Sequence, residues 1–283
     1  MIQKIKNFII EGKHSKPIVT DVCFAKTENE KPLVVFCHGY KGYKDWGVFD
    51  QMANSFVSEN IFLAKFNFSH NGGTLEQPID FPDLEAFGEN NFIKELDDLE
   101  SVLDWLLANN DFSNEIDPEQ ITLIGHSRGG GIVTLKAAED KRVSKVISWA
   151  GVSDFASRFP KGSVLDHWKN EGVAYIENAR TKQQMPHYFQ FYTNFVENEE
   201  RLTIHKAAAS LRVPHLIIHG TNDTSVDLKE AKALHSWNPN SEFFVIKNAD
   251  HAFGAKHPWE EAVLPEHFQI LLEKSIQFIK VES

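Results

Sequence analysis

Residues 121–131 read Ile-Thr-Leu-Ile-Gly-His-Ser-Arg-Gly-Gly-Gly. This segment begins with a mostly apolar run and leads into a second one over 132–139. The first run predicts a buried strand and the second predicts a helix. Between them, Gly125, Ser127 and Gly129 form the pattern Gly-x-Ser-x-Gly, which is typical of a very tight strand-to-helix turn that exposes its serine. The glycines let the backbone bend sharply and let the helix approach the strand. We interpret Ser127 as a nucleophile near the positive end of that helix, with a simple helix cap as the competing interpretation.

The overall charge of the chain argues against two classes of partner. The chain has 283 residues and a formal net charge of -11, without a cluster of lysines or arginines. Nucleic acid and anionic membrane surfaces are therefore not expected as partners. No stretch has the composition of an interdomain linker, so we expect a single domain over 1–283.

The N-terminus and the two cysteines predict a cytoplasmic protein. Residues 1–10 carry Lys4 and Lys6 but lack the continuous apolar segment of a signal peptide, and no run is long enough to span a bilayer. Cys23 and Cys37 both lie in apolar, strand-like runs. That context favours buried free thiols in a reducing compartment, and a disulfide between them is the alternative.

Strands and helices alternate along most of the chain. Apolar runs predict strands at 3–10, 17–26, 33–37, 61–68, 121–125, 145–150, 213–218 and 242–246. Helical periodicity predicts helices at 46–60, 90–109, 132–139, 225–236 and 259–281, with a loop at 69–88. The acids of 90–109 are expected on its solvent side. The first two strands should form a hairpin, and the rhythm elsewhere predicts an α/β fold with a mostly parallel, eight-stranded sheet and helices on both faces.

The rhythm stops between 151 and 210, where no apolar strand is visible but many aromatic residues are scattered among polar ones. We expect 152–210 to be a cap insertion over the carboxyl ends of the strands, where open α/β sheets bind their ligands. Most of its aromatic residues are expected to form the core of a small helical subdomain. A minority, with Trp168 as the candidate, should line a substrate pocket.

A serine nucleophile needs a base to take its proton and an acid to orient that base. Both should follow later strands, in the order serine, acid, histidine. The strand at 213–218 leads into Asp223, and the strand at 242–246 leads into His251. We therefore predict Ser127, Asp223 and His251 as the catalytic residues.

Other acids and histidines compete for these roles. Asp227 lies at a helix start, where it should stabilise the helix dipole, and Asp250 should hydrogen-bond within its own loop. His257 and His267 fall at or inside the last predicted helix and are expected at the surface. His126 lies in the tight turn itself, where it is too constrained to reach the hydroxyl of its neighbour.

Acyl transfer also needs two backbone N–H groups directed at the oxyanion. Arg128 follows the serine at the helix start, so its N–H is one expected donor. The loop after the third strand should supply the other, and we choose the N–H of Tyr40. The side chain of His38 is expected to fix that loop by hydrogen bonds, and Asp45 and Trp46 are interpreted as helix-start residues.

Together these motifs resemble the α/β-hydrolase superfamily. The matching segments lie, in order, at 38–42, 125–130, 219–223 and 250–253. The chain resembles the branch that contains cinnamoyl and feruloyl esterases, dienelactone-hydrolase-like proteins and the catalytic domains of prolyl-oligopeptidase-type peptidases. The resemblance implies the α/β-hydrolase fold with a cap, the same three catalytic residues, and an oxyanion hole made by the amides of Tyr40 and Arg128.

Two departures from that branch limit which activities transfer. The sequence has no N-terminal propeller of the kind that the oligopeptidases carry. Dienelactone hydrolase itself uses a cysteine at the position of Ser127. The resemblance therefore implies the catalytic apparatus more strongly than any one substrate.

The expected activity is hydrolysis of small acyl or arylacyl carboxylic esters through an acyl-enzyme on Ser127, with a small-molecule ester as the partner. No cofactor and no metal are required, and neither a His-Glu-x-x-His nor a P-loop pattern occurs in the sequence. Two alternatives stay open. One is a peptidase or amidase that uses the same residues, and the other is a non-catalytic homologue that binds a ligand.

Overall fold

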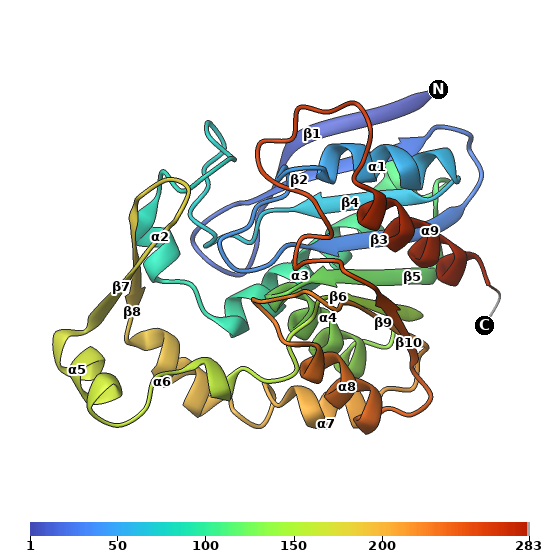
Figure 1. Cartoon of the computed structure of the whole chain (residues 1–283). Helices are drawn as coiled ribbons and strands as arrows, with labels where there is room; N and C mark the ends of the chain where they lie inside the picture. Colours follow the sequence, from blue (N-terminus) through green and yellow to red (C-terminus); the bar gives the residue numbers. More distant parts are fainter. Residues whose placement is uncertain (282–283) are drawn as a thin grey trace.

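An eight-stranded sheet forms the centre of the molecule, in the order β1-β2-β4-β3-β5-β6-β9-β10 (Figure 1). In this computed structural model, which describes residues 1–281, the strands are β1 (Ile2–Ile10), β2 (Ile18–Ala25), β3 (Lys31–Cys37), β4 (Phe62–Phe66), β5 (Ile116–His126), β6 (Lys145–Trp149), β9 (His215–Gly220) and β10 (Glu242–Ile246). β2 is antiparallel to both β1 and β4, and the other neighbours are parallel. The predicted mostly parallel, eight-stranded sheet is confirmed.

Helices cover both faces of this sheet (Figure 1). α1 (Phe49–Ser58) and α9 (Glu266–Lys280) pack on one face, and the other face carries α3 (Phe92–Ala108), α4 (Arg128–Glu139), α7 (Ile204–Ser210) and α8 (Leu228–Trp237). Alternate residues of β3 point to opposite sides, so Leu33 and Val35 join the core under α3 and α4 while Val34 joins the core under α1 and α9. Among the described helices none has the length and apolar character needed to cross a membrane.

The two cysteines lie in this core as predicted. Cys23 and Cys37 are both buried and both free. Burial raises the pKa of each thiol, and that of Cys37 rises well above its usual range. The disulfide alternative is therefore wrong.

α3 departs from its predicted amphipathic pattern. The sequence pattern predicts its acids on the solvent side, but Glu95 and Asp98 are buried. Each carboxylate has a partner that periodicity does not reveal. Asp98 accepts a hydrogen bond from the Ser69 N–H at 2.7 Å, and Glu95 contacts Arg128 at the start of α4. Burial raises the pKa of Asp98 to about 7.

The insertion between β6 and β9 contains strands where none was expected. It holds α5 (Ser163–Glu171), the antiparallel hairpin of β7 (Val173–Glu177) and β8 (Gln184–Tyr188), and α6 (Gln190–Glu197). The hairpin lies beside α2 (Leu84–Gly88), a short helix inside the segment predicted as a loop (Figure 1). The expectation of a strand-free insertion is therefore wrong. The sequence does not reveal these strands because two short strands that pair only with each other give a weak periodic signal.

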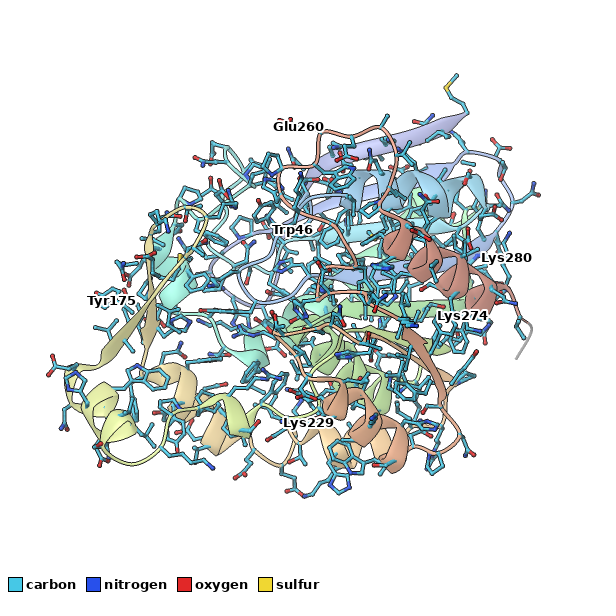
Figure 2. The ribbon with its side chains drawn as sticks, in the orientation of Figure 1. Trp46, Tyr175, Lys229, Glu260, Lys274 and Lys280 are labelled. Carbon is cyan, nitrogen blue, oxygen red and sulfur yellow. The ribbon has the colours of Figure 1, made fainter. Side chains whose placement is uncertain are left out.

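The aromatic residues of the insertion pack into the core of the sheet. The expectation that they form a separate core of their own is therefore wrong. Phe155 stacks on Phe92 of α3 with ring centroids 3.8 Å apart, and Phe191 packs in the same cluster. Tyr175, by contrast, lies on the outer edge of the hairpin (Figure 2). One apolar cluster thus runs from the sheet into the insertion. We therefore propose that the chain forms one domain with 152–210 as its cap.

The last helix begins later than the sequence pattern suggests. α9 starts at Glu266, directly after Pro265, whereas the predicted start was at 259. His257 consequently lies in a loop instead of a helix. Its Nδ1 accepts a hydrogen bond from the Gly47 N–H at 2.9 Å, and the residue is half-buried, so its predicted place at the start of the last helix is wrong.

One buried histidine belongs to the core of the sheet. His215 lies at the start of β9, where its Nε2 is hydrogen-bonded to the hydroxyl of Ser148 at 2.9 Å. Its Nδ1 has no partner among the described residues. Burial lowers the pKa of His215 to about 3, so the ring is neutral in the folded protein near neutral pH.

We predict that His215 makes the folded protein less stable in mild acid. An unfolded histidine has a pKa of about 6.5, so below that pH the unfolded state binds a proton that folded His215 excludes. Stability is therefore lost as the pH falls from about 6.5 toward the folded pKa. Between about pH 7.5 and 5, this group should lower the free energy of unfolding by about 2 kcal/mol. Urea unfolding of wild type and His215→Phe at both pH values measures the effect.

The matched control is His167→Phe, because His167 is exposed on α5. This variant should keep the pH dependence of the wild type. Equal pH dependence in wild type and His215→Phe would contradict the prediction.

Candidate active site

The tight turn after β5 holds Ser127 in a strained backbone conformation. Its φ is +58° and its ψ is −118°, a combination that non-glycine residues rarely adopt. The Ser127 N–H donates to the Trp149 carbonyl at 2.9 Å, and the Ser127 carbonyl accepts from the Gly130 N–H at 3.0 Å. α4 begins at Arg128, and the serine side chain makes no capping hydrogen bond. The predicted strand-turn-helix context is confirmed. Ser127 occupies the N-cap position of α4, but its side chain does not cap the helix.

Two glycines allow β5 and α4 to approach closely. A Cβ atom on Gly125 would lie 2.1 Å from the Gly129 carbonyl oxygen, and one on Gly129 would lie 2.5 Å from the Cys37 carbonyl oxygen. Both distances are far inside van der Waals contact, and the obstructing atoms belong to the backbone, which has no room to shift in a close-packed core. Only glycine fits either position.

Asp223 and His251 meet where the loops after β9 and β10 come together. The two strands are parallel neighbours, and His251 Nδ1 lies 2.7 Å from Asp223 Oδ2. The Asp223 side chain is fully buried, and its other oxygen accepts the N–H groups of Ser225 and Val226 at 2.8 Å each. Both residues are predicted from the sequence, and the structure brings them together.

The charge of Asp223 is stabilised despite its burial. Burial by itself raises the pKa of the carboxyl group. Hydrogen bonds from His219, from His251 and from the Val226 N–H outweigh that effect, so the pKa falls well below its usual range. An ionised Asp223 requires the proton of the His251 imidazole to sit on Nδ1, which leaves Nε2 as the basic nitrogen.

His126, beside the serine, supports the loop that carries His251. Its Nε2 is hydrogen-bonded to the His251 carbonyl oxygen at 2.8 Å, and the two rings lie 4.7 Å apart between centroids. Burial lowers the pKa of His126 to about 3, so its ring is neutral and donates from Nε2. This contact gives the His126 side chain a structural role in the His251 loop.

The loop after β3 supplies the other side of the site. His38 Nδ1 donates to the Gly39 carbonyl at 2.8 Å, and His38 Nε2 accepts the Phe68 N–H at 3.3 Å, which confirms its predicted loop-fixing role. Burial lowers the pKa of His38 to about 4. Across residues 1–281, the backbone N–H groups of Tyr40 and Arg128 have no recorded protein acceptor. Both amides are therefore available to a ligand.

The competing acids are engaged elsewhere. Asp227 is itself the N-cap of α8, where its side chain accepts the Lys229 N–H at 2.8 Å. Asp250 accepts the N–H groups of Ala252 and Gly254 within its own loop, as predicted. Neither carboxylate is hydrogen-bonded to His251 in the described part of the chain.

A cavity of about 780 Å³ is lined by both Ser127 and His251. Ligand sites for small molecules have volumes of this order. No hydrogen bond between Ser127 and His251 is recorded among the described residues. Tyr40 reaches the wall from the loop after β3, and the other Phe, Tyr and Trp side chains of the wall come from α3 and from the cap, namely Phe92, Phe155, Phe159, Trp168 and Phe191. Trp168 lines the cavity while its Nε1–H donates to the His187 carbonyl at 2.7 Å.

All charged side chains that line the cavity are basic, although the chain as a whole is acidic. Arg128 pairs with Glu95 at 3.3 Å, and Arg158 pairs with Glu230 at 2.6 Å. Lys41 has no ion-pair partner among the described residues. The wall of the cavity thus combines aromatic rings with a few cationic groups.

Two side chains of the site could not be found from the sequence pattern. His187 of β8 lines the cavity, but β8 itself gives no readable strand signal. Glu95 holds Arg128 from α3, yet it lies in a helix rich in acids where nothing distinguishes it from exposed neighbours. Both become visible only through contacts between distant segments.

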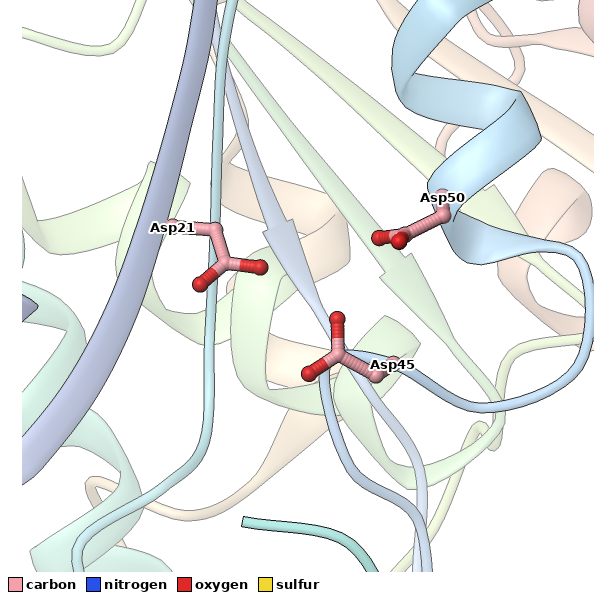
Figure 3. Close-up of side chains that lie close together, drawn as sticks. All are labelled: Asp21, Asp45 and Asp50. Carbon is pink, nitrogen blue, oxygen red and sulfur yellow. The ribbon is translucent and has the colours of Figure 1, made fainter. Parts of the chain in front are cut away.

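Three carboxylates elsewhere lie close enough to resemble a metal site. Oxygens of Asp21, Asp45 and Asp50 lie within 4.8 Å of one another (Figure 3). Two buried lysines bind these same oxygens. Lys65 Nζ lies 3.0, 2.5 and 2.7 Å from the three carboxylates in turn, and Lys44 Nζ lies 2.8 Å from Asp21 and 2.5 Å from Asp45. The cluster is an ion-pair network, and the interpretation of Asp45 as only a helix-start residue is wrong.

Comparison with known proteins gives one matching family. The profile of a family described as alpha/beta hydrolase fold matches residues 83–255, which is more than half of the chain. The quorum-quenching protein AidA of Acinetobacter baumannii is 27% identical over 128 residues, covering 45% of this chain and 38% of AidA. The chain spans less than half the length of the curated relatives that it matches.

Solved structures match over nearly the whole chain. Est1E from Butyrivibrio proteoclasticus with ferulic acid bound has a TM-score of 0.69 at 16% identity, covering 96% of this chain and 97% of its own. A puromycin-hydrolyzing peptidase of Mycobacterium tuberculosis has a TM-score of 0.64 at 17% identity, covering 98% of this chain and 38% of its own. At such low identity these likenesses concern the fold.

We predict that the ion-pair network around the three aspartates of Figure 3 depends on Lys65 for stability and binds no divalent cation. Lys65→Met removes an ammonium group that contacts all three carboxylates, and leaving a buried charge uncompensated costs roughly 3–5 kcal/mol. Urea unfolding at neutral pH measures the loss. The control is Lys229→Met, since Lys229 is exposed on α8 (Figure 2) and should change stability by less than about 0.5 kcal/mol.

Thermal melting of the wild type with added Mg²⁺ or Ca²⁺ checks the prediction that the network binds no divalent cation. A melting temperature that rises with either cation would contradict it. A Lys65→Met variant as stable as the wild type would contradict the predicted dependence on Lys65.

Proposed function

The chain belongs to the alpha/beta hydrolase fold family, and from this premise we propose that it is a serine hydrolase that cleaves carboxylic esters through an acyl-enzyme on Ser127. The observation that carries the proposal is the hydrogen bond of 2.7 Å between His251 and buried Asp223, beside a cavity that both His251 and Ser127 line. A nucleophile, a base and an orienting acid are the groups that acyl transfer requires.

The proposed reaction begins when Ser127 Oγ attacks the ester carbonyl. His251 Nε2 takes the hydroxyl proton, and the Asp223 carboxylate stabilises the imidazolium that results. The amides of Tyr40 and Arg128 donate to the oxyanion of the tetrahedral intermediate. The C–O bond to the alcohol then breaks, and His251 returns its proton to the leaving alcohol. Water attacks the acyl-enzyme by the same sequence and releases the carboxylic acid.

Proton transfer in this scheme needs a hydrogen bond between Ser127 and His251 that forms once a substrate is bound. Catalytic hydrogen bonds are often long or misaligned before binding and tighten in the complex. The serine hydroxyl makes no capping bond, so it is free to turn toward the base.

A small acyl or arylacyl ester is the proposed substrate class. The aromatic wall favours a flat or apolar acyl group, and Trp168 is the proposed substrate-binding residue in that wall. Est1E is a protein of the same fold with ferulic acid bound, which makes an aryl ester a suitable first test. The net charge of -11 also fits a small molecule better than nucleic acid.

Two other functions are separated by experiment. A peptidase or amidase would use the same groups on a poorer leaving group, and the puromycin-hydrolyzing peptidase is an example on this fold. A non-catalytic homologue would need none of the three catalytic candidates, whereas Ser127, Asp223 and His251 all occur here.

We predict that Ser127→Ala lowers kcat for esters by several orders of magnitude and leaves the fold intact, because it removes only the nucleophilic oxygen. The measurement is hydrolysis of p-nitrophenyl esters from acetate to long chains, with methyl ferulate added, by wild type and Ser127→Ala. The same series on Trp168→Ala tests whether Trp168 contacts the acyl group. If it does, the dependence of the rate on the acyl group should change in this variant.

Wild-type activity no higher than that of Ser127→Ala on every ester would overturn the esterase proposal. Matched anilides would then decide between an amidase and a non-catalytic protein. A flat acyl profile that Trp168→Ala does not alter would remove Trp168 from the substrate site.

We predict opposite results for two neighbouring acids. Asp223→Asn should lower kcat roughly 10⁴-fold, because a neutral amide neither fixes the tautomer of His251 nor stabilises its imidazolium. Asp227→Asn should change kcat less than about twofold, since asparagine caps a helix as well as aspartate does. Steady-state kinetics on one ester ranks the two variants, and the reverse ranking would mean that Asp227 is the acid.

A further inference from the structure

The side chains of Tyr40 and Arg128, whose amides form the proposed oxyanion hole, pack on each other. The Arg128 guanidinium lies 4.5 Å from the centroid of the Tyr40 ring. It also lies over the rings of Phe92 and Phe191, at 5.3 and 5.4 Å. A planar guanidinium stacks well on aromatic faces, so this contact links the loop after β3 to the start of α4.

Arg128 is held from α3 by a buried carboxylate. Its Nη1 lies 3.3 Å from Glu95 Oε1, and the same oxygen accepts Asn90 Nδ2 at 2.7 Å. Glu95 is only 3% exposed. Burial raises the pKa of Glu95, while Arg128 and Asn90 oppose that rise. A buried ion pair adds little stability over apolar residues of similar size, but it fixes the direction of the arginine side chain.

Tyr40 is held from the cap hairpin by a single hydrogen bond. Its hydroxyl lies 2.9 Å from His187 Nε2, and His187 Nδ1 lies 3.2 Å from the Met185 carbonyl oxygen. A carbonyl oxygen only accepts, so the imidazole proton sits on Nδ1 and Nε2 accepts from the tyrosine. Burial lowers the pKa of His187 to about 4 and raises that of Tyr40 to about 12, which keeps this donor and acceptor pair intact near neutral pH.

The His187 side chain is thus fully engaged in positioning Tyr40. Both of its nitrogens are used by protein atoms, although it lines the same cavity as Ser127. Tyr40 belongs to the loop after β3, so the bond joins segments 147 residues apart in the sequence. A continuous chain of contacts therefore runs from α3 through Glu95, Arg128 and Tyr40 to His187 on β8.

We propose that His187 is a positioning residue that holds the oxyanion amide of Tyr40 in register with that of Arg128, and that it acts through the Tyr40 side chain. The cap hairpin is then a part of the catalytic apparatus as well as a wall of the substrate cavity. This proposal rests on the proposed function, because it concerns how that reaction stabilises its oxyanion.

The consequence is a specific kinetic signature. Oxyanion donors act on charge that develops only in the transition state, so a misplaced donor lowers kcat and leaves KM nearly unchanged. Complete loss of one donor costs about 10²- to 10³-fold in kcat. Loosening a donor through its side chain should cost less, on the order of tenfold.

The test uses Tyr40→Phe, His187→Phe and the double variant. Tyr40→Phe keeps the ring under Arg128 and removes only the hydroxyl. His187→Gln is the conservative variant, because its amide oxygen can accept the same hydrogen bond. The matched control is Tyr188→Phe. This variant also removes a tyrosine hydroxyl, but one that lies on β8 and is bonded to Glu85. Thermal melting confirms that each variant is folded.

Two rates are measured for every protein. The first is the turnover of p-nitrophenyl butyrate, with kcat and KM determined separately. The second is the rate at which a fluorophosphonate probe labels Ser127, in which the serine oxygen bonds to phosphorus and fluoride leaves. The labelling reaction also develops negative oxygen charge beside the two amides but needs no ester turnover.

Tyr40→Phe and His187→Phe are each expected to lower kcat and the labelling rate about tenfold, with KM changed less than about twofold. The double variant should be no slower than either single one, because both remove the same contact. His187→Gln should recover most of the rate, and Tyr188→Phe should match the wild type. A rise in KM at constant kcat, additive losses in the double variant, or an equal loss in Tyr188→Phe would each overturn the proposal.

Ser127→Ala separates this proposal from the proposed function. Turnover that persists in Ser127→Ala would overturn the function, and the positioning proposal with it. Turnover that depends on Ser127 but is equal in wild type, Tyr40→Phe and His187→Phe would overturn only the positioning proposal. A protein that is labelled at Ser127 but cleaves no ester still tests it through the labelling rate, and absence of both reactions would overturn both.

Discussion

The backbone strain at Ser127 is the constraint on which the rest of the site depends. A residue with φ of +58° at the end of a central strand persists only where its surroundings over-determine it. Here the close approach of Gly125 to Gly129 fixes one side of the turn, and the hydrogen bond from Ser127 to the Trp149 carbonyl fixes the other. α4 starts at Arg128, so the same packing sets the amide beside the serine. The candidate nucleophile and one proposed oxyanion donor are thus positioned by a single backbone arrangement.

The parallel sheet brings the remaining groups to that turn. β9 and β10 are parallel neighbours, so the loops at their carboxyl ends lie side by side, and Asp223 and His251 need only short segments to meet. The fully buried Asp223 side chain is a strong acceptor because protein donors replace the water it has lost. Geometry and charge therefore select one tautomer of His251, which leaves its Nε2 available to a serine hydroxyl.

Features that depend on neighbouring residues in the chain can be predicted from the sequence, and features that depend on contacts between distant segments cannot. The turn at Ser127, the Asp223 loop and the His251 loop can be predicted because each is a local signal at the end of an apolar strand, and the parallel sheet then brings them together. Glu95 reads as a solvent-facing acid because its partner Arg128 lies 33 residues away, and Asp45 reads as a helix start because Lys65 lies 20 residues away. The β7–β8 hairpin escapes notice because its strands pair only with each other.

The contacts of the cap make the proposed oxyanion hole depend on the hairpin, which the sheet alone would not do. The turn at Ser127 fixes the Arg128 amide, whereas Tyr40 lies in the loop after β3, where its side chain is restrained by Arg128 and by His187 of the hairpin. In the proposed arrangement, any movement of the hairpin that breaks the Tyr40 hydroxyl bond also loosens one oxyanion donor. A substrate that packs against the cap aromatics would hold the hairpin in place and keep both amides aligned. Binding of the acyl group and stabilisation of the transition state would then act through the same few side chains.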